Sequence, residues 1–210
     1  MKADSVFFDL DDTLHEGDLF RSYLLFLAKK SVLRLVLLLP LVVPALVGYL
    51  ICPDRRWSVS FILWILTVLT RERSLLDLDA EFSCEFSRGM RRYSEPYGEL
   101  CRYIECGTHV YVVSGSPESL VRRVYGDLLV RPEITLIGSR FSRFIGGRVL
   151  QVRCVLNEKV RQIQLRSGYE LKFKAGYSDS EKDGPVLGLC AEKYRVNSDG
   201  MIERWPSDSF

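Results

Sequence analysis

The sequence predicts an α/β protein with a mainly parallel sheet and helices on both faces of that sheet. The first observation is that short apolar, β-favouring runs alternate with longer segments of helical spacing, which is typical of parallel sheets with helical crossovers. The second is that three of these runs end in polar residues, Asp9, Ser114 and Asp179. Ligands of such sheets bind outside the carboxyl ends of the strands, so we expect these three residues to share one crevice.

The first half of the chain combines one strand with a series of helices. Residues 6–8 form an apolar, β-favouring run that predicts a buried strand. An apolar block follows in two runs, 35–52 and 57–69, which a proline and charged residues separate. Helices are expected at 20–33, 74–93 and 96–107, where helical spacing or a helix-starting proline is present.

The second half alternates strands and helices more regularly. Strands are expected at 110–113, 134–137, 171–175 and 194–196, with a hairpin at 144–149 around Gly146 and Gly147. Helices are expected at 117–124, 157–165 and 185–190. Strands that alternate with helices in this way are expected to lie parallel in one sheet.

Composition limits the class of protein further. The 210 residues suit one domain of ordinary size with an insertion. A net charge of +2 argues against nucleic-acid binding, and an apolar content of 47% excludes a disordered chain. The six cysteines show no C-x-x-C spacing, so we expect free thiols in a reducing compartment. Acidic residues near the N-terminus argue against an export signal.

Two carboxylates follow the first predicted strand in Asp9-Leu10-Asp11-Asp12-Thr13. Positions i and i+2 of an extended chain point the same way, so Asp9 and Asp11 can face one reacting centre. One carboxylate can attack phosphorus, while the other protonates the leaving oxygen and later deprotonates water. Two close carboxylates favour a hard cation such as Mg²⁺. The alternative is an acidic surface turn without catalytic function.

Ser114 and Lys159 are candidate phosphate-binding residues. The hydroxyl of Ser114 and the neighbouring backbone N–H groups, including that of Gly115, can hold a phosphoryl oxygen near the start of a helix. Lys159 lies early in a predicted helix and can neutralise a transferring phosphoryl group. The alternatives are a helix-capping serine and a solvated surface lysine.

Asp179 and Asp183 lie four residues apart after a predicted strand. Asp179, at the strand end, can bind a metal ion directly. Asp183 can bind the ion through water or orient Lys159, and therefore supports the site. The alternative is an acidic loop that caps a helix.

The ordered set of Asp9 and Asp11, Ser114, Lys159 and Asp179 through Asp183 resembles the haloacid-dehalogenase (HAD) superfamily of aspartate-nucleophile phosphatases. The resemblance implies a Rossmann-like catalytic core at 1–15 and 107–210 and a helical cap inserted at 16–106. It implies that Asp9 is the nucleophile and that Asp11 is the acid and base. Ser114, Gly115 and Lys159 would hold the phosphoryl group, and Asp9, Asp11 and Asp179 would bind Mg²⁺. Many members have Gly at the position of Asp12, although Asp also occurs there.

Within that superfamily, the chain is similar to subfamily IB, and nearly end to end to a group of bacterial inner-membrane lipid phosphatases. This likeness rests on the two apolar runs, of which the second contains tryptophan, and on short motifs that include Ser114-Gly115-Ser116-Pro117 and Gly176-Tyr177-Ser178-Asp179-Ser180. It implies that phosphatidylglycerophosphate is the substrate and phosphatidylglycerol the product. Membrane lipids are then partners, nucleic acid is not, and the oligomeric state stays open.

The apolar block 32–69 is expected to associate the cap with the membrane. Its first run has 18 uncharged residues, about 27 Å of helix against a hydrocarbon core of ~30 Å. Because Asp9 precedes the block and the other motifs follow it, the block must cross an even number of times, or dip in and return. Basic residues that flank the block outnumber Arg55 and Arg56 at its turn, which favours a cytoplasmic catalytic core. The alternative is a soluble cap rich in Leu and Val.

Two other functions remain open at this stage. The chain can be a soluble phosphomonoesterase of the phosphoserine-phosphatase kind that acts on a small metabolite, although the apolar block argues against this. It can also be a lipid-binding protein that has lost catalysis. The presence of both Asp9 and Asp11 argues against that alternative.

Overall fold

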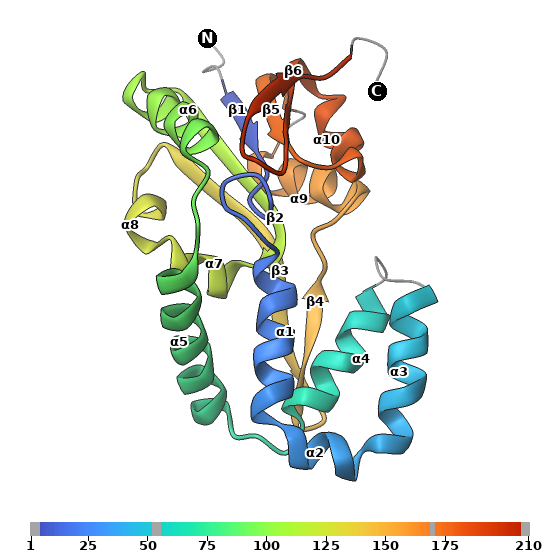
Figure 1. Cartoon of the computed structure of the whole chain (residues 1–210). Helices are drawn as coiled ribbons and strands as arrows, with labels where there is room; N and C mark the ends of the chain where they lie inside the picture. Colours follow the sequence, from blue (N-terminus) through green and yellow to red (C-terminus); the bar gives the residue numbers. More distant parts are fainter. Residues whose placement is uncertain (1–4, 52–55, 169–170, 207–210) are drawn as a thin grey trace.

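A seven-stranded sheet lies mainly in the upper half of the molecule, and its edge strand β4 reaches down beside α4 (Arg56–Thr67) (Figure 1). The computed structural model describes residues 5–51, 56–168 and 171–206. The strand order is β4-β3-β2-β1-β5-β6-β7. Five strands run parallel, and the two edge strands β4 and β7 are antiparallel to their neighbours. The strands are β1 (Ser5–Phe8), β2 (His109–Pro117), β3 (Ile134–Phe144), β4 (Gly147–Val152), β5 (Phe173–Ser178), β6 (Cys190–Val196) and β7 (Ile202–Arg204).

Helices cover both faces of the sheet, because successive residues of each strand point to opposite sides. Phe7 lies in an apolar cluster with Ile163 of α9 (Asn157–Ser167) and Val186 of α10 (Gly184–Leu187). Phe8 lies in a second cluster, with residues of α6 (Ser94–Glu105), α7 (Glu118–Val124) and α8 (Gly126–Leu129). The expected α/β core with a mainly parallel sheet is therefore confirmed.

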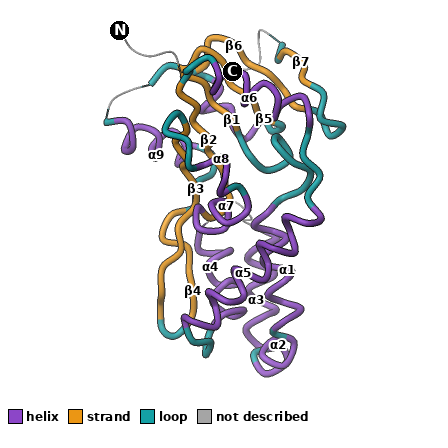
Figure 2. Tube along the Cα trace, turned by 90° about the vertical axis from the view of Figure 1, so that its left-hand side faces the viewer, coloured by secondary structure: helices purple, strands orange, loops and turns teal. Residues whose placement is uncertain are grey.

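The lower half of the molecule is a lobe of helices to which the sheet contributes a hairpin (Figures 1 and 2). The β3–β4 hairpin extends down from the sheet, and β4 packs along α4. The chain therefore passes into this lobe twice. The helices are α1 (Leu19–Lys30), α2 (Val32–Leu37), α3 (Leu39–Ile51), α4 (Arg56–Thr67) and α5 (Glu72–Gly89).

The hairpin corrects the expectation of an all-helical cap. The inserted elements are helices, but the lobe is completed by strands that come from the second half of the chain. Phe141 and Leu150 of the hairpin lie in the same apolar cluster as Tyr23 of α1 and Leu63 of α4. Helix α6, which falls within the segment 16–106, packs instead on the sheet through Leu100 and Ile104.

The expectation of one long apolar helix over 35–52 is wrong. The chain forms two shorter helices, α2 and α3, and turns at Leu38 between them. Pro40 explains the break, because proline has no N–H to donate and its ring clashes with the carbonyl four residues earlier. In the first turn of α3 that missing donor costs nothing. The carbonyl of Leu38 accepts the amides of Leu41 and Val42 instead.

In the described part of the chain, no helix combines the length and the apolar character needed to cross a bilayer. Helix α3 has 13 residues, about 20 Å of rise. Arg55, expected at the turn between the two apolar runs, lies outside the described residues. Arg56 begins α4 and donates a hydrogen bond to the carbonyl of Gln151 at 2.7 Å.

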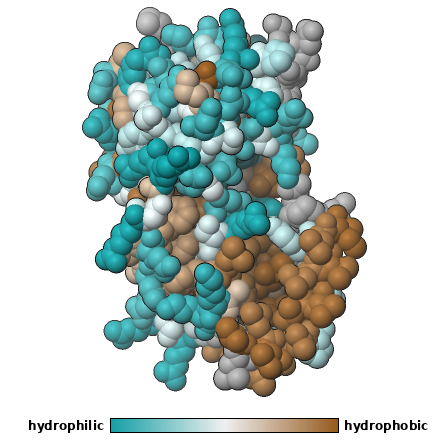
Figure 3. Space-filling model, in the orientation of Figure 1, coloured by the Kyte–Doolittle hydropathy of each residue, from teal (hydrophilic) through white to brown (hydrophobic). Residues whose placement is uncertain are grey.

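The apolar block forms a continuous apolar surface over α2, α3 and α4, seen in brown in Figure 3. Large side chains point outward along it, among them Leu37, Leu50 and Ile51, each more than 70% exposed. Monomeric soluble proteins rarely expose large apolar patches, which mark protein or membrane interaction sites. The surface over α2, α3 and α4 is therefore a candidate interaction site.

The described cysteines carry free thiols: Cys84, Cys101, Cys106, Cys154 and Cys190. Free thiols that are mostly buried would suit the cysteine spacing, but of the described cysteines only Cys154 and Cys190 are buried, whereas Cys84 and Cys106 are exposed. Cys52 lies outside the described residues. Burial raises the pKa of the Cys154 thiol to about 12, so this thiol is un-ionised at neutral pH.

A buried ion pair joins the hairpin to the helices of the lower lobe. The Arg148 guanidinium donates to both oxygens of Asp79, at 2.9 and 2.8 Å, and to Glu72 at 2.8 Å. The Tyr23 hydroxyl donates to Asp79 at 2.6 Å. Arg148 and Asp79 are both at most 5% exposed. The pair thus ties β4, α5 and α1 together where water does not reach.

We expect Asp79→Ala to destabilise the lobe strongly. The substitution leaves the guanidinium of Arg148 buried without its principal partner, which costs about 3 kcal/mol or more. Asp77→Ala is a matched control on the same helix, because Asp77 is exposed; its effect should stay within about 0.5 kcal/mol. Urea unfolding followed by circular dichroism measures both. Equal losses in the two variants would show that the ion pair does not hold the lobe.

Candidate active site

The strand order brings the predicted site residues to one edge of the sheet. Strand β1 lies between β2 and β5, so Asp9, at the end of β1, has Ser114 of β2 on one side and Asp179, after β5, on the other. Helix α9 contributes Lys159, which contacts Asp9 at this edge. Residues far apart in the sequence therefore meet at the carboxyl ends of parallel strands, where such sheets bind ligands.

Lys159 is held between two carboxylates in the buried part of the site. Its ammonium donates to Asp9 Oδ1 at 2.6 Å and to Asp183 Oδ2 at 2.8 Å. Asp9, Lys159 and Asp183 are each at most 6% exposed. Burial alone would lower the pKa of Lys159, but Asp183 and Asp9 more than offset this and raise it. Lys159 is therefore a permanent positive charge beside Asp9 rather than a solvated surface lysine.

Asp183 is positioned by the chain that follows β5. It ends a short 3₁₀ helix (Glu181–Asp183), and Ser178, the last residue of β5, donates to its Oδ2 at 2.8 Å. Asp183 thus orients Lys159 directly, which is one of the two roles expected for it.

Asp11 is surrounded by hydrogen-bond donors. The hydroxyl of Ser114 donates to its Oδ2 at 2.7 Å, and that of Ser116 donates to the same oxygen at 2.8 Å. The backbone N–H of Leu19, at the start of α1, donates to Oδ1 at 2.8 Å. Burial raises the pKa of Asp11 to about 6, and the charge of Asp18 adds to this rise. Asp11 can therefore exchange a proton near neutral pH, as an acid and base must.

Asp179 lies close to Asp9 through a shared neighbour. The hydroxyl of Thr13 is 3.4 Å from Asp9 Oδ2 and 3.4 Å from Asp179 Oδ1. It also accepts the backbone N–H of Asp179 at 3.0 Å. Burial, and then the charges of Asp183 and Asp12, raise the pKa of Asp179 to about 6. Like charges that raise one another's pKa form an environment that a bound cation stabilises.

The expected three-carboxylate metal site is only partly assembled. Among the described side chains, no three of Asp, Glu, His or Cys form a group that could hold a metal ion. The reason is the orientation of Asp11, whose carboxylate is engaged by Ser114 and Ser116. Asp9 and Asp179 remain, and their oxygen donors suit a hard cation. The residues present thus fit Mg²⁺ through these two carboxylates.

Some contributors to the site were not assigned from the sequence. Ser116 was quoted only as part of a motif, yet it donates to Asp11 and accepts the backbone N–H of Phe20 at 3.1 Å. The signal was present, because Ser114 and Ser116 are two apart in a strand and so point the same way. Ser139 was not singled out; its hydroxyl donates to the carbonyl of Gly115 at 2.6 Å.

Asp12 stands where many members of the resembled superfamily have Gly, and the backbone explains why an aspartate fits there. Its φ of 55° lies in the left-handed region, where Gly is favoured and Asp is among the tolerated residues. The Asp12 side chain supports this turn, because Oδ1 accepts the backbone N–H of Gly17 at 2.7 Å. Asp12 therefore serves the geometry of the loop that carries Asp11.

Comparison with known proteins identifies the family. Residues 6–188 match the family described as haloacid dehalogenase-like hydrolase. The chain belongs to the HAD-like hydrolases. The match contains Asp9, Asp11, Ser114, Lys159 and Asp179.

Solved structures of other proteins share the fold of this HAD-like hydrolase. A protein of unknown function from Bordetella pertussis Tohama I has a TM-score of 0.68 at 18% identity, over 91% of this chain and 89% of that one. A phospho-aspartyl intermediate analogue of phosphoserine phosphatase has a TM-score of 0.56 at 16% identity, over 92% and 86%. Cytosolic 5′-nucleotidase IIIB bound to cytidine has a TM-score of 0.52 at 14% identity, over 91% and 72%.

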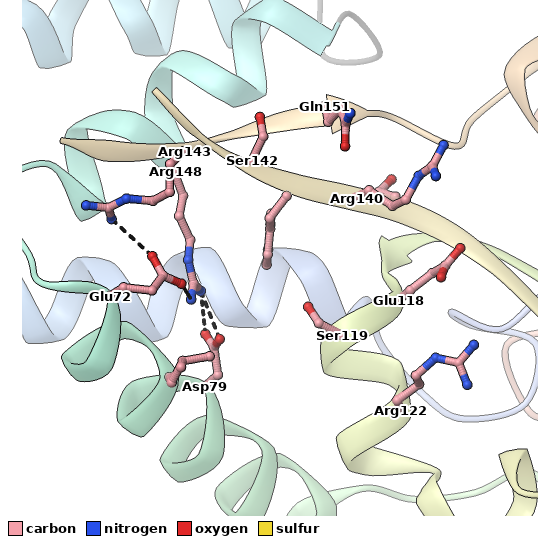
Figure 4. A pocket seen from close by; sticks show the side chains of 13 residues that line it. Glu72, Asp79, Glu118, Ser119, Arg122, Arg140, Ser142, Arg143, Arg148 and Gln151 are labelled. Atoms are coloured by element: carbon pink, nitrogen blue, oxygen red, sulfur yellow. Dashed lines mark hydrogen bonds and ion pairs between the residues drawn. The ribbon is translucent and has the colours of Figure 1, made fainter. Parts of the chain in front are cut away.

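A cavity of about 500 Å³ adjoins the site of this HAD-like hydrolase without containing it (Figure 4). It lies between α5, α7 and the β3–β4 hairpin. The linked side chains of Glu72, Asp79 and Arg148 are on one side of it, and Arg122 is on the other. Two of its lining residues adjoin the segment 114–117. Ser139 donates to the carbonyl of Gly115, and Glu118 follows Pro117 directly. Asp9, Asp11, Lys159 and Asp179 do not line this cavity.

The raised pKa of Asp11 predicts how stability depends on pH. The pKa of about 6 in the folded state exceeds the ~3.9 of an unfolded aspartate. The folded state therefore binds more protons between these values, and the contribution of Asp11 to stability is lost as the pH rises through 6. In chelator, Asp11→Asn should be more stable than the wild type by roughly 3 kcal/mol at pH 7.5, with almost no gain at pH 4. A gain of equal size at both pH values would contradict this assignment.

Proposed function

We propose that this HAD-like hydrolase is a phosphoric monoester hydrolase that works through an aspartyl-phosphate on Asp9. The observation that carries the proposal is the contact of 2.6 Å between Lys159 Nζ and Asp9 Oδ1 at the edge of the sheet, with Asp11 two residues further along. Burial raises the pKa of Asp9, and the ammonium of Lys159 acts against this rise by stabilising the carboxylate. The same ammonium can neutralise an incoming phosphoryl group. Asp11, with its raised pKa, is the proton donor that the leaving group needs.

The reaction follows in two steps from these positions. Asp9 attacks phosphorus, the phosphorus–oxygen bond of the ester breaks, and protonated Asp11 gives its proton to the leaving oxygen. Asp11 then takes a proton from water, the water oxygen attacks phosphorus, and the bond between phosphorus and Asp9 breaks. The backbone N–H of Gly115 and Lys159 hold the phosphoryl oxygens throughout. The Ser114 hydroxyl, which donates to Asp11 in the structure, would turn to the phosphoryl group when it binds. Bound Mg²⁺, held by Asp9 and Asp179, would supply positive charge that stabilises the transferring group.

The first candidate substrate is a small soluble phosphomonoester. Its support is the likeness of the fold to phosphoserine phosphatase and to a cytosolic nucleotidase over nine-tenths of the chain. The solved structures favour this substrate class over a lipid. A phosphate group on a small metabolite would reach Asp9 when the two lobes move apart.

The second candidate is phosphatidylglycerophosphate, which would make the protein similar in function to phosphatidylglycerophosphatase C. Its support is the apolar surface over α2, α3 and α4, together with the sequence likeness of the motifs and the apolar block. Under this proposal the surface enters the cytoplasmic leaflet of a bacterial inner membrane without crossing it. The acyl chains stay in the leaflet while the terminal phosphate reaches Asp9.

Phosphate release from a panel of substrates tests the proposal. The purified protein is assayed with phosphatidylglycerophosphate in detergent micelles and with phosphoserine and nucleoside monophosphates in solution. Release from any of them supports a phosphomonoesterase. Faster turnover of the lipid selects the second candidate, and faster turnover of a soluble ester selects the first. Absence of release from the whole panel would overturn the proposed activity.

Asp9→Asn should abolish turnover and leave the fold intact. The substitution preserves shape but removes the charge that makes the nucleophile, and such a loss costs several orders of magnitude in rate. Asp12→Asn is the matched control three residues away, because asparagine tolerates the left-handed backbone of Asp12 and can still accept the Gly17 N–H. Its rate should stay within about threefold of the wild type. Near-normal activity of Asp9→Asn would exclude the covalent mechanism.

Removal of divalent cations should stop the reaction reversibly. With EDTA in excess we expect no phosphate release, and Mg²⁺ should restore it, because Asp9 and Asp179 offer only oxygen donors. The same experiment on Asp179→Asn should require more Mg²⁺ for half-maximal rate. Full activity in a preparation shown by elemental analysis to contain no metal would exclude a metal-dependent mechanism.

A further inference from the structure

An apolar groove of about 280 Å³ lies in the lower lobe, away from the catalytic centre. Four helices form it, and its walls come from the apolar block on one side and from α1 on the other. Ala45 and Leu66 are buried, and Leu24, Ala28 and Tyr49 are half-buried. Principal lining residues are Leu24 and Ala28 of α1, Leu35 of α2, Ala45 and Tyr49 of α3, and Leu66 of α4.

Helix α1 connects this groove to the catalytic acid. The helix begins at Leu19, whose N–H donates to Asp11. Arg21, two residues later, is exposed and contributes to the groove lining. Ala28 lies two turns beyond Arg21, so the groove follows α1 for about 11 Å away from the end of the helix that contacts Asp11. The Arg21 end of the groove is therefore the end nearer to Asp11 along α1.

The composition of the groove determines what fits it. Apolar side chains supply nearly all of the lining, so the occupant must be a hydrocarbon along most of its length. The guanidinium of Arg21 at the end nearest Asp11 favours an anionic group there. Leu25 and Leu46 at the rim are 57% and 49% exposed, and they connect the groove with the apolar surface of α3. A chain can thus enter from that surface.

We propose that this groove binds one acyl chain of a membrane phospholipid whose terminal phosphate reaches Asp9. The inference rests on the second candidate function and assigns it a specific subsite. The chain lies along α1 between α3 and α4, and the anionic part of the headgroup passes Arg21 on its way to the centre. The second acyl chain stays in the leaflet against the exposed surface of α3. The groove then selects lipid esters over small ones by the length of the chain.

A series of alkyl monophosphates tests the groove without a membrane. Ethyl, hexyl, decyl and tetradecyl phosphates are assayed below their micelle-forming concentrations. Each buried methylene should raise kcat/KM by about fourfold, mainly through KM, until the groove is full. Beyond that length the values should level off. A flat series, with ethyl phosphate hydrolysed as well as decyl phosphate, would overturn the groove and leave the phosphomonoesterase standing.

Two substitutions in α3 test whether the groove causes the dependence of kcat/KM on chain length. Ala45→Phe puts a ring into the groove, so the rise of kcat/KM should stop at a shorter chain while ethyl phosphate is hydrolysed as before. Val43→Phe is the matched control, because Val43 is 57% exposed on α3 and does not line the groove. It should follow the wild type. Identical chain-length series in the two variants would overturn the assignment, and circular dichroism checks that both fold.

A binding measurement separates this inference from the proposed activity. Ethylphosphonate and decylphosphonate, which cannot be hydrolysed as esters, are titrated calorimetrically into Asp9→Asn. A decyl compound that binds at least a hundredfold more tightly supports the groove even if no ester is turned over. Equal affinities would overturn it whatever the activity. If no ester in the series is hydrolysed but the decyl compound binds tightly, the proposed function fails and the groove stands.

Discussion

The site depends on one positive charge that the fold places where water is excluded. The ammonium of Lys159 contacts Asp9 and Asp183, and all three side chains are almost completely buried. A buried charge without partners would cost far more than the fold can supply. The folded protein must therefore pack the ends of β1 and β5 against the start of α9, so that Lys159 has both partners. Ser178 and Thr13 then complete the hydrogen bonds that leave each oxygen with a donor.

The two lobes differ in where they place apolar and charged side chains. The sheet lobe hides its apolar residues between strands and helices, in two clusters on opposite faces. The lower lobe buries some apolar residues in one of these clusters, among them Tyr23, Leu63 and Phe82, but exposes many others along α2, α3 and α4. It also buries a charged pair, Arg148 and Asp79. The exposed apolar surface is understandable if the medium on that side of the lobe is apolar. The buried pair adds to the apolar contacts that hold the hairpin against the helices.

Local pattern and a topological rule explain what the sequence could predict. Asp9 and Asp11 could be predicted from their spacing, and Ser114 and Asp179 from the rule that parallel strands share their carboxyl ends. Lys159 lies on a helix, and its role was expected from the resemblance to the family. The packing of the hairpin into the lower lobe was not readable, because Arg148 and Asp79 are 69 residues apart and neither has a local signature. The break at Leu38 follows from Pro40, whose effect on a preceding helix is well defined.

The hydrogen bond from the Leu19 N–H to Asp11 links the position of the lower lobe to the protonation of the catalytic acid. The donor belongs to α1, which is part of the lower lobe, whereas Asp11 belongs to the loop after β1. A lobe rotation that carried Leu19 away would change the pKa of Asp11 in two opposite ways. Loss of the Leu19 N–H would raise the pKa, whereas entry of water would lower it by relieving the burial that is the main cause of its rise. Because burial is the larger of these causes, an open site would favour the carboxylate of Asp11 and a closed site would favour the protonated acid.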